Sequence, residues 1–189
     1  MVSAILLAAG ESKRMGEPKL LLPFGNSTVL EQAIDNLLNS RVGEVIVVVG
    51  DRAQELIGNR PVKVAINPAY REGMSTSIVT GLNLIDDSTR AVMLALADQP
   101  LVDSQTINKL IEAFISHDKG IVIPAYKGRR GHPVIFSTKY KEELLGLVGD
   151  IGGRQIIEEH PEDVLELAVD SQGINVDIDT KDDYHSLVD

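Results

Sequence analysis

Hydrophobic residues along this chain form short unbroken runs, separated by segments in which apolar and polar residues are mixed. The unbroken runs predict buried strands at residues 2–9, 44–50, 62–66, 90–97, 120–125, 134–137 and 164–169. The mixed segments predict helices at residues 29–39, 53–57, 75–84, 103–116, 138–147 and 155–159, and a short last helix begins at Thr180. Strands that alternate with helices predict an α/β fold with a mainly parallel sheet covered on both faces. The most apolar run, at 90–97, is expected at the centre of this sheet.

A basic loop follows the first predicted strand. Gly10 ends the apolar run, and Lys13, Arg14 and Lys19 then place three cations within seven residues. Gly10 and Gly16 allow backbone N–H groups to approach a ligand, and such groups beside cations indicate a site for an anion, with triphosphate the expected one. The loop matches neither the Walker pattern nor the Gly-x-Gly-x-x-Gly pattern of dinucleotide sites. The alternative interpretation is a solvated basic loop.

Composition narrows the choice of ligand and location. The 189 residues predict a single domain, 1–189, and a formal net charge of −10 argues against binding to nucleic acid or anionic membranes. An acidic protein that binds triphosphate needs local cations and a divalent metal. The chain has no cysteine, which excludes disulfides, thiolate nucleophiles and cysteine metal sites. No apolar run approaches the ~18 residues of a membrane span, and the first strand is too short for a signal peptide, so a cytoplasmic location is expected.

Carboxylates follow other predicted strands, at the sheet edge where α/β proteins bind ligands. Asp98 ends the central strand, where a Mg²⁺ ligand is expected. Its alternative role, capping the next helix, is already available to Asp103 and Ser104. Alternation places Asp177 and Asp179 on one side of the chain, and neighbouring carboxylates repel unless a cation separates them. One of the two is expected to join Asp98 on the metal, and the sequence leaves open which.

Two other segments each have two interpretations. Ser75, Thr76 and Ser77 lie in the first turn of a predicted helix, where they bind a ligand or cap the helix. The basic, glycine-rich residues 126–133 form a second binding segment or a solvated hairpin turn.

The pattern Leu-Ala-Ala-Gly-x-Ser-x-Arg-Met-Gly-x-Pro-Lys at residues 7–19 resembles the signature of molybdenum-cofactor cytidylyl- and guanylyltransferases, members of the MobA-like NTP transferases. The details at 8–10 and 18–21 resemble the cytidylyl branch. Further matches are Asn-Pro-x-x-x-x-Gly-Met-x-x-Ser at 67–77, Asp-Gln-Pro at 98–100, Gly-His-Pro-Val-x-Phe at 131–136, Gly-Asp-x-Gly-x-Arg at 149–154 and Asp-Ile-Asp-Thr-x-x-Asp-Tyr at 177–184. Gly153 replaces the family's Ala, which is expected to loosen that loop slightly, and Lys181 replaces a Pro.

This resemblance implies a Rossmann-like three-layer sandwich of the nucleotide-diphospho-sugar transferase type. It also implies a Mg²⁺-dependent enzyme that transfers CMP from CTP to the phosphate of a molybdopterin-type acceptor, releases pyrophosphate and passes its product to a molybdoenzyme. The implied catalytic residues are Arg14, Lys19 and Asp98. The implied nucleotide-binding residues are Leu7, Ala8, Ala9, Gly10, Ser12, Arg14, Lys19, Gly73, Met74, Ser77 and Asp98.

The same resemblance implies metal ligands among Asp98, Asp177 and Asp179. The implied acceptor-binding residues are Gln99, Pro100, His132, Pro133, Asp150 and Arg154. An acceptor phosphate is already ionised at neutral pH and needs no general base, so His132 is interpreted as a binding or structural residue. An ion pair between Asp150 and Arg154 is the alternative for those two residues. The other three histidines, His117, His160 and His185, are expected to face solvent.

Other functions fit the same motifs. One is a nucleotidyltransferase that uses another NTP, such as GTP, or another acceptor, such as a sugar phosphate or methylerythritol phosphate. A second is a protein that binds and delivers the molybdenum cofactor without chemistry. The presence of both Lys19 and Asp98 favours an enzyme, because a carrier needs no clamp for a leaving group.

Overall fold

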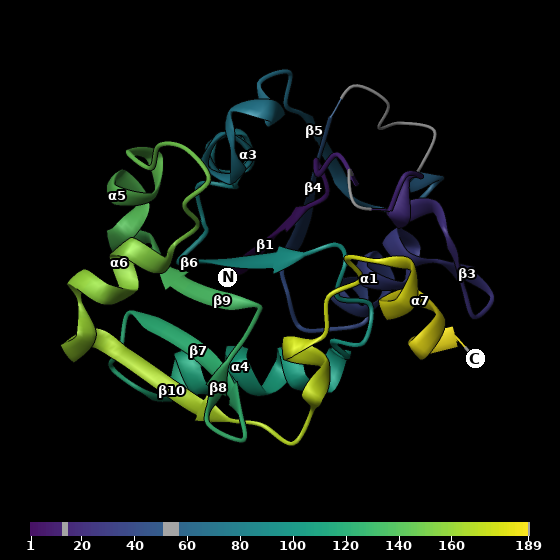
Figure 1. Cartoon of the computed structure of the whole chain (residues 1–189). Helices are drawn as coiled ribbons and strands as arrows, with labels where there is room; N and C mark the ends of the chain where they lie inside the picture. The colour runs from purple at the N-terminus through teal and green to yellow at the C-terminus, as the bar shows by residue number, and fades with distance from the viewer. Residues whose placement is uncertain (13–14, 51–56, 189) are drawn as a thin grey trace.

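A mixed β-sheet forms the middle of the molecule (Figure 1). The computed structural model describes residues 1–12, 15–50 and 57–188. In these ranges the sheet has eight strands: β1 Val2–Leu7, β4 Glu44–Val49, β5 Lys63–Ile66, β6 Ala91–Leu96, β7 Ile121–Tyr126, β8 Arg129–Arg130, β9 Val134–Ser137 and β10 Val164–Ala168. A separate hairpin pairs β2 Pro23–Phe24 with β3 Ser27–Thr28.

The strand order is β10-β7-β9-β6-β1-β4-β5, with β8 paired to β7. The pairs β1–β4, β1–β6, β4–β5 and β7–β10 are parallel, whereas β9 runs antiparallel to both of its neighbours. The predicted central position of β6 is therefore confirmed. The carboxyl ends of β1, β4, β5 and β6 meet at one edge of the sheet, because these four strands run in the same direction.

Helices cover both faces of the sheet (Figure 1). On one face α1 Val29–Leu38, α4 Ser104–Ser116 and the last helix, α7 Lys181–Val188, pack against residues such as Ala4 and Leu6 of β1. On the other face α3 Met74–Leu82, α5 Lys141–Leu145 and α6 Arg154–Glu159 pack around Ile5 and Phe136. Successive residues of a strand point to opposite faces, so each buried strand contributes to two hydrophobic cores. The predicted three-layer arrangement is confirmed.

Short 3₁₀ turns connect these elements: η1 Lys19–Leu21, η2 Tyr70–Glu72, η3 Thr138–Tyr140, η4 Pro161–Asp163 and η5 Gln172–Asn175. Most predicted elements agree with the structure to within one or two residues, and the predicted helix at 138–147 is instead η3 followed by α5. The predicted helix at 53–57 lies outside the described residues except for its last residue. The segment that carries Asp177 and Asp179 belongs to no strand. Among the described residues, no helix has the length and apolar character that crossing a membrane requires.

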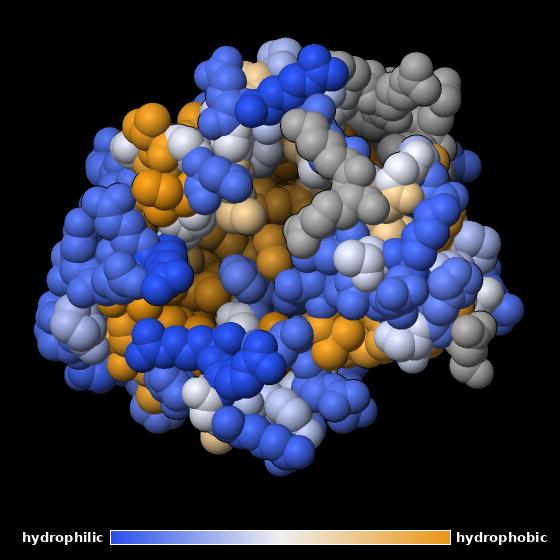
Figure 2. All heavy atoms as spheres, viewed as in Figure 1, coloured by the Kyte–Doolittle hydropathy of each residue, from blue (hydrophilic) through white to orange (hydrophobic). Residues whose placement is uncertain are grey.

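One face of the molecule is hollowed, with an apolar floor and a hydrophilic rim (Figure 2).

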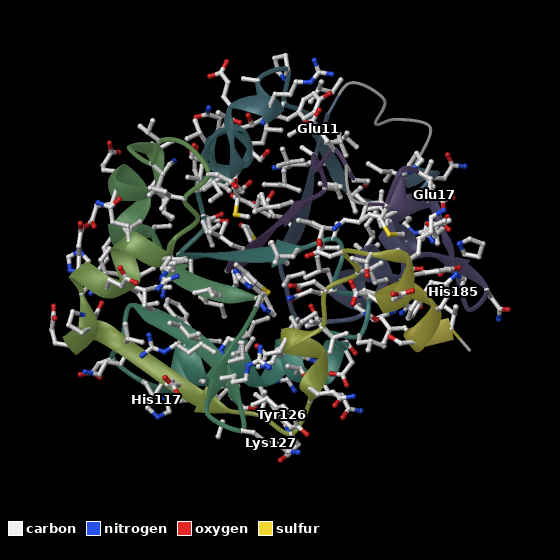
Figure 3. All side chains as sticks on the ribbon, in the orientation of Figure 1. Glu11, Glu17, His117, Tyr126, Lys127 and His185 are labelled. Carbon is white, nitrogen blue, oxygen red and sulfur yellow. The ribbon has the colours of Figure 1, made fainter. Side chains whose placement is uncertain are left out.

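Elsewhere the surface carries most of the histidines. His117 and His185 are exposed at the periphery, as the sequence predicts (Figure 3). His160 is half-buried, because its Nε2 lies 2.9 Å from a carboxylate oxygen of Glu143 and its ring packs on Tyr140.

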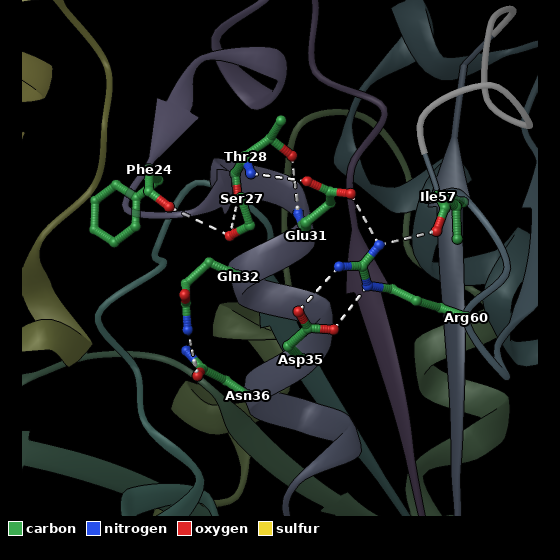
Figure 4. Close-up of polar contacts among 9 residues, drawn as sticks. All are labelled: Phe24, Ser27, Thr28, Glu31, Gln32, Asp35, Asn36, Ile57 and Arg60. Carbon is green, nitrogen blue, oxygen red and sulfur yellow. Dashed lines mark hydrogen bonds and ion pairs between the residues drawn. The ribbon is translucent and has the colours of Figure 1, made fainter.

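Arg60 ties the segment before β5 to α1 (Figure 4). Its guanidinium donates two hydrogen bonds, of 2.7 and 3.0 Å, to the carboxylate of Asp35 and a third, of 2.9 Å, to Glu31. The hydrogen bonds to Asp35 are the main cause that raises the pKa of Arg60. Glu31 also completes a capping box with Thr28, in which each side chain accepts a hydrogen bond from the other residue's backbone N–H. This network fixes the start of α1.

Candidate active site

A cavity of about 600 Å³ opens beyond the carboxyl ends of β1, β5 and β6. It lies at the edge where the topology of the sheet directs the loops that follow these strands. Its walls come from five parts of the chain that are distant in sequence. The lining residues are Leu7, Ala9, Gly10, Glu11, Ser12, Lys19, Tyr70, Arg71, Glu72, Gly73, Met74, Ser77, Leu96, Asp98, Asp150 and Asp179.

The ammonium of Lys19 connects two carboxylates in the wall of this cavity. Its Nζ lies 2.7 Å from Oδ2 of Asp98 and 3.1 Å from Oδ1 of Asp179. These contacts join residues that are 79 and 160 positions apart in the chain. The Lys19 side chain is only 12% exposed, and the Asp98 side chain is 22% exposed. The basic loop and the predicted metal-binding aspartates therefore meet at one point.

Burial and charge act in opposite directions on this group of side chains. Burial lowers the pKa of Lys19, but its pairing with Asp98 and Asp179 outweighs burial, so the net pKa is raised and the ammonium stays charged. Burial raises the pKa of Asp98, and the charge and hydrogen bond of Lys19 only partly oppose that rise. Burial thus disfavours the charged form of Asp98, and the Lys19 ammonium offsets part of that effect.

The loop after β1 closes on itself through Ser12. The backbone N–H of Lys19 donates to the Ser12 hydroxyl (3.2 Å), and the N–H of Met15 donates to the Ser12 carbonyl (3.0 Å). Met15 is buried, and Gly16 has a φ of +72°, a conformation that favours glycine. Arg14, predicted to be catalytic, and Lys13 lie outside the described residues. Of the predicted nucleotide-binding residues in this loop, Ala8 is buried behind the cavity wall, and Leu7, Ala9, Gly10, Ser12 and Lys19 line it.

The segment after β5 forms the opposite wall. Gly73, Met74 and Ser77, which the family pattern identifies, line the cavity, and Ser75 does not. Gly73 has a φ of +119°, and a Cβ there would lie 2.4 Å from the backbone of Gly149. Both requirements explain why the position holds a glycine.

Polar groups in the first turn of α3 already have partners within the protein. The N–H groups of Met74 and Ser75 donate to the Asp150 carboxylate (3.2 Å) and to the Gly149 carbonyl (3.2 Å). The hydroxyl of Ser77 accepts a hydrogen bond from the Asn67 amide (3.0 Å). The N-cap residue, Gly73, has no side chain to cap α3, so a neighbouring loop accepts hydrogen bonds from the first amides instead.

A C-terminal strap, residues 171–180, brings Asp179 to the cavity. Ile174 and Ile178 are fully buried in the core beside α1 and α4. The N–H of Ile178 donates to the carbonyl of Asp98 (3.0 Å). The amide nitrogen of Gln99 donates to Asp177 and to the Ile174 carbonyl. Asp177 therefore points to Gln99, and Asp179 shares the Lys19 ammonium with Asp98.

The predicted acceptor-binding residues lie in different places. Asp150 lines the cavity, whereas Gln99, Pro100 and Pro133 are buried and belong to the structure behind it. Arg154 is exposed and donates to Glu158 (2.7 Å), so the alternative ion pair with Asp150 does not form.

His132 is half-buried beside this structure. Burial lowers its pKa, although the charges of Asp177 and Asp98 oppose this effect. A neutral imidazole agrees with a binding or structural role.

The basic segment 126–133 forms a hairpin whose turn lies far from the cavity. Tyr126 pairs with Arg129 across the turn, and the sequence did not predict strand β8. Lys127 and Tyr126 lie on one side of the molecule and Glu11 on the other (Figure 3). Arg130 donates to Glu166 of β10 (2.8 Å). The tip is an exposed hairpin turn, and the binding of an acceptor by this segment stays a prediction.

Five cavity residues were not predicted: Glu11, Tyr70, Arg71, Glu72 and Leu96. The Nε of Arg71 lies 3.3 Å from a carboxylate oxygen of Glu11, and its guanidinium lies over the Tyr70 ring. The sequence pattern could have indicated three of them, because residues 70–72 lie in the loop after β5, which ends at the ligand-binding edge of the sheet. Their side chains match no family motif, so motif comparison passed over them.

Comparison with known proteins gives the family. A family model described as "MobA-like NTP transferase domain" matches residues 4–164, which include most of β1, all of α3 and Asp98. The chain belongs to this family. The MobA-like family consists of nucleotidyltransferases, so family and fold together indicate an enzyme.

Individual relatives of this MobA-like chain carry different names. Nicotine blue oxidoreductase of Paenarthrobacter nicotinovorans is 30% identical, over 99% of this chain and 96% of its own length. The molybdenum cofactor cytidylyltransferase of Escherichia coli K12 is 27% identical, over 97% of this chain and 93% of its own length.

The crystal structure of Rv0371c from Mycobacterium tuberculosis H37Rv matches with a TM-score of 0.90 and 30% identity, over 99% and 96% of the two chains. A structure of Rv0371c in complex with manganese matches with a TM-score of 0.85 and 28% identity, over 99% and 97%.

The donor set of the MobA-like site fits a divalent metal. Asp98 and Asp179 offer carboxylate oxygens that one cation, the Lys19 ammonium, already contacts together. Mg²⁺ and Mn²⁺ prefer such oxygen ligands, and Mg²⁺ holds them at about 2.1 Å. Asp98 and Asp179 are therefore the residues that would hold such an ion.

Proposed function

We propose that this chain is a Mg²⁺-dependent nucleotidyltransferase that transfers CMP from CTP to the phosphate of a molybdopterin-type acceptor and releases pyrophosphate. The observation that carries the proposal is the meeting of Lys19, Asp98 and Asp179 in the cavity wall. A cationic loop and an acidic metal-binding pair in contact provide the two charges that phosphoryl chemistry needs. The named cytidylyltransferase relative supports the choice of donor and acceptor.

The proposed residue roles follow from charge. Amides near Gly10, with Arg14 and Lys19, bind the β- and γ-phosphates and neutralise the pyrophosphate as it leaves. Asp98 and Asp179 hold the divalent ion, which when bound neutralises charge on the phosphates and polarises the α-phosphate. Asp179 is favoured over Asp177, because the Asp177 carboxylate is engaged by Gln99.

The chemical step needs no covalent enzyme intermediate. An ionised oxygen of the acceptor phosphate attacks the α-phosphorus in line, the new P–O bond forms, and the bond to the β-phosphate oxygen breaks. The electron pair leaves with pyrophosphate, whose charge Lys19 and Arg14 offset. The protein contributes alignment and fixed charge, which account for most of the rate in phosphoryl transfer. Asp150 is proposed to face the acceptor, and Gln99 to position the C-terminal strap.

The test is pyrophosphate release with a panel of CTP, GTP, ATP and UTP, with Mg²⁺ and a molybdopterin acceptor. CTP should give the highest rate, and Lys19→Ala and Asp98→Ala should each remove most turnover. The variant Lys63→Ala is the matched control, because Lys63 also pairs with a carboxylate, that of Glu44, but at the other edge of the sheet. Release with another NTP would revise the donor, and cofactor binding without any release would favour a delivery protein.

The relative named nicotine blue oxidoreductase supports a second candidate, a redox reaction on a small molecule in the same cavity. Reduction of quinonoid dyes by nicotinamide or flavin donors tests it. Dye reduction that needs no NTP, with no pyrophosphate release, would favour this candidate over nucleotidyl transfer.

A further inference from the structure

The Lys19 ammonium lies where a metal that bridges Asp98 and Asp179 would lie. It contacts one oxygen of each carboxylate, at 2.7 and 3.1 Å, and these are the two side chains that the donor chemistry assigns to a divalent ion. With two of its three N–H donors on these carboxylates, Lys19 has only one left for a leaving pyrophosphate. These contacts and the role proposed for catalysis therefore compete for one ammonium.

We propose that Lys19 is an internal substitute for the divalent ion. When no nucleotide is bound, it offsets part of the negative charge of Asp98 and Asp179 and blocks metal binding. The metal gains these carboxylates only when a triphosphate draws Lys19 away. This inference rests on the proposed function, because it needs the same two carboxylates to bind the metal.

Charge bookkeeping supports the exchange. Taken by themselves, Asp98, Asp179 and the Lys19 ammonium sum to a charge of −1, whereas the same two carboxylates with a divalent ion sum to zero. The released ammonium then faces the highly charged triphosphate, which compensates the contacts that Lys19 gives up. The lysine side chain suits this movement, because its charge is compact and its stem of four carbons is flexible.

The backbone is arranged so that only the side chain needs to move. Lys19 begins the turn η1, and its N–H is held by the Ser12 hydroxyl. Leu20, the next residue, is buried in the core. The main chain at Lys19 therefore stays fixed between the basic loop and the two carboxylates. Rotation of the side chain then directs the ammonium either to Asp98 and Asp179 or to a triphosphate bound along the basic loop.

The experiment measures Mn²⁺ binding without nucleotide, by electron paramagnetic resonance of free Mn²⁺ and by calorimetry. Lys19→Met should bind Mn²⁺ at least about tenfold more tightly than the wild type, because a competing positive charge is removed from the site. Adding Asp98→Asn to Lys19→Met should abolish this gain. The control Lys63→Met, which removes a lysine–carboxylate pair at the other edge of the sheet, should bind Mn²⁺ like the wild type.

Equal or weaker Mn²⁺ binding by Lys19→Met overturns the proposal, and so does a gain that survives Asp98→Asn. Circular dichroism and thermal melting verify folding, and Lys19→Gln, which keeps a polar side chain of similar length, repeats the test if the Met variant is unfolded. Pyrophosphate release by the wild type is scored separately. Tighter Mn²⁺ binding without any such release upholds the role of Lys19 and rejects the proposed nucleotidyl transfer.

Discussion

Two carboxylates at opposite edges of the sheet should respond to neutralisation in opposite ways. Asp98 lies beyond the carboxyl end of β6, and Glu44 lies at the start of β4. We expect Asp98→Asn to abolish turnover without loss of stability, and Glu44→Gln to lower stability without loss of turnover. The pair separates a carboxylate kept for chemistry from one kept for folding.

The stability of Asp98→Asn follows from its surroundings. Burial opposes the charge of Asp98 more than Lys19 favours it, since the net pKa is raised. Lys19 keeps its contact with Asp179 in the variant. The free energy of unfolding should therefore change by less than about 1 kcal/mol, because the lost ion pair and the relieved burial of a charge largely cancel. Loss of a metal ligand removes several kcal/mol of transition-state stabilisation, which is about a hundredfold or more in rate.

The effect of Glu44→Gln is worked from its contacts. The carboxylate accepts hydrogen bonds from the Ser3 hydroxyl (2.6 Å) and the Asp86 N–H (2.8 Å), and it pairs with Lys63 at 2.7 Å. A hydrogen bond to a charged group exceeds a neutral one by about 1 kcal/mol, and the half-exposed ion pair adds at most about 1 kcal/mol. The variant should lose about 2–3 kcal/mol, or roughly 5–10 °C in Tm for a chain of this size.

The assays are thermal melting at pH 7 and pyrophosphate release, both on the two variants and the wild type. Retained turnover in Asp98→Asn would refute the assignment of Asp98 to the metal. A drop in Tm for Asp98→Asn as large as that for Glu44→Gln would refute the argument that burial offsets its ion pair.

Three further predictions concern stability. Gln99→Leu should leave Tm within about 3 °C, because two effects on stability oppose each other: the variant loses the hydrogen bonds to the C-terminal strap, and it also loses a buried amide oxygen that has no hydrogen-bond partner among the described residues. Turnover of the same variant should fall at least about tenfold, because the strap loses its alignment. Gly153→Ala should cost about 1–3 kcal/mol in a melting experiment, because its Cβ would lie 2.3 Å from the ring of buried Phe136, whereas Gly146→Ala, with no contact under 3.5 Å, should cost less. Burial raises the pKa of Glu44, but its hydrogen bonds and ion pair lower the pKa by more, so the net pKa lies below 4.5. The contribution of Glu44 to the free energy of unfolding is therefore complete above pH 4.5 and is lost as the pH falls through the lowered pKa. When Tm is measured against pH, the decrease in acid should be shallower in Glu44→Gln than in the wild type.

That Lys19 and Asp98 lie at the same edge could be anticipated from the sequence, because both follow strands predicted to be parallel in one covered sheet. The direct pairing of these two strands, which brings the side chains into contact, is seen only in the structure. The sequence could not select between Asp177 and Asp179. That choice depends on a strap outside the sheet, anchored by Ile174 and Ile178, to which strand alternation does not apply.

Contacts between distant loops were equally hidden. Gly153 was expected to loosen its loop, but it allows close packing against Phe136, which lies on another element. The partners of the first α3 amides come from Gly149 and Asp150, about seventy-five positions away in the chain. The local sequence pattern identifies which groups a residue can use for hydrogen bonding or packing, but the partner of each group depends on the tertiary structure.

The carboxylate of Asp150 has a consequence for anyone seeking inhibitors. It already accepts a hydrogen bond from the Met74 N–H at the start of α3, so the electropositive end of that helix is satisfied by the protein itself. A compound with an extra acidic group directed at α3 would have to displace the Asp150 carboxylate from the Met74 N–H. The negative charge of Asp150 would also repel that acidic group. Compounds that instead present a hydrogen-bond donor or a cation to Asp150 would gain from the same feature.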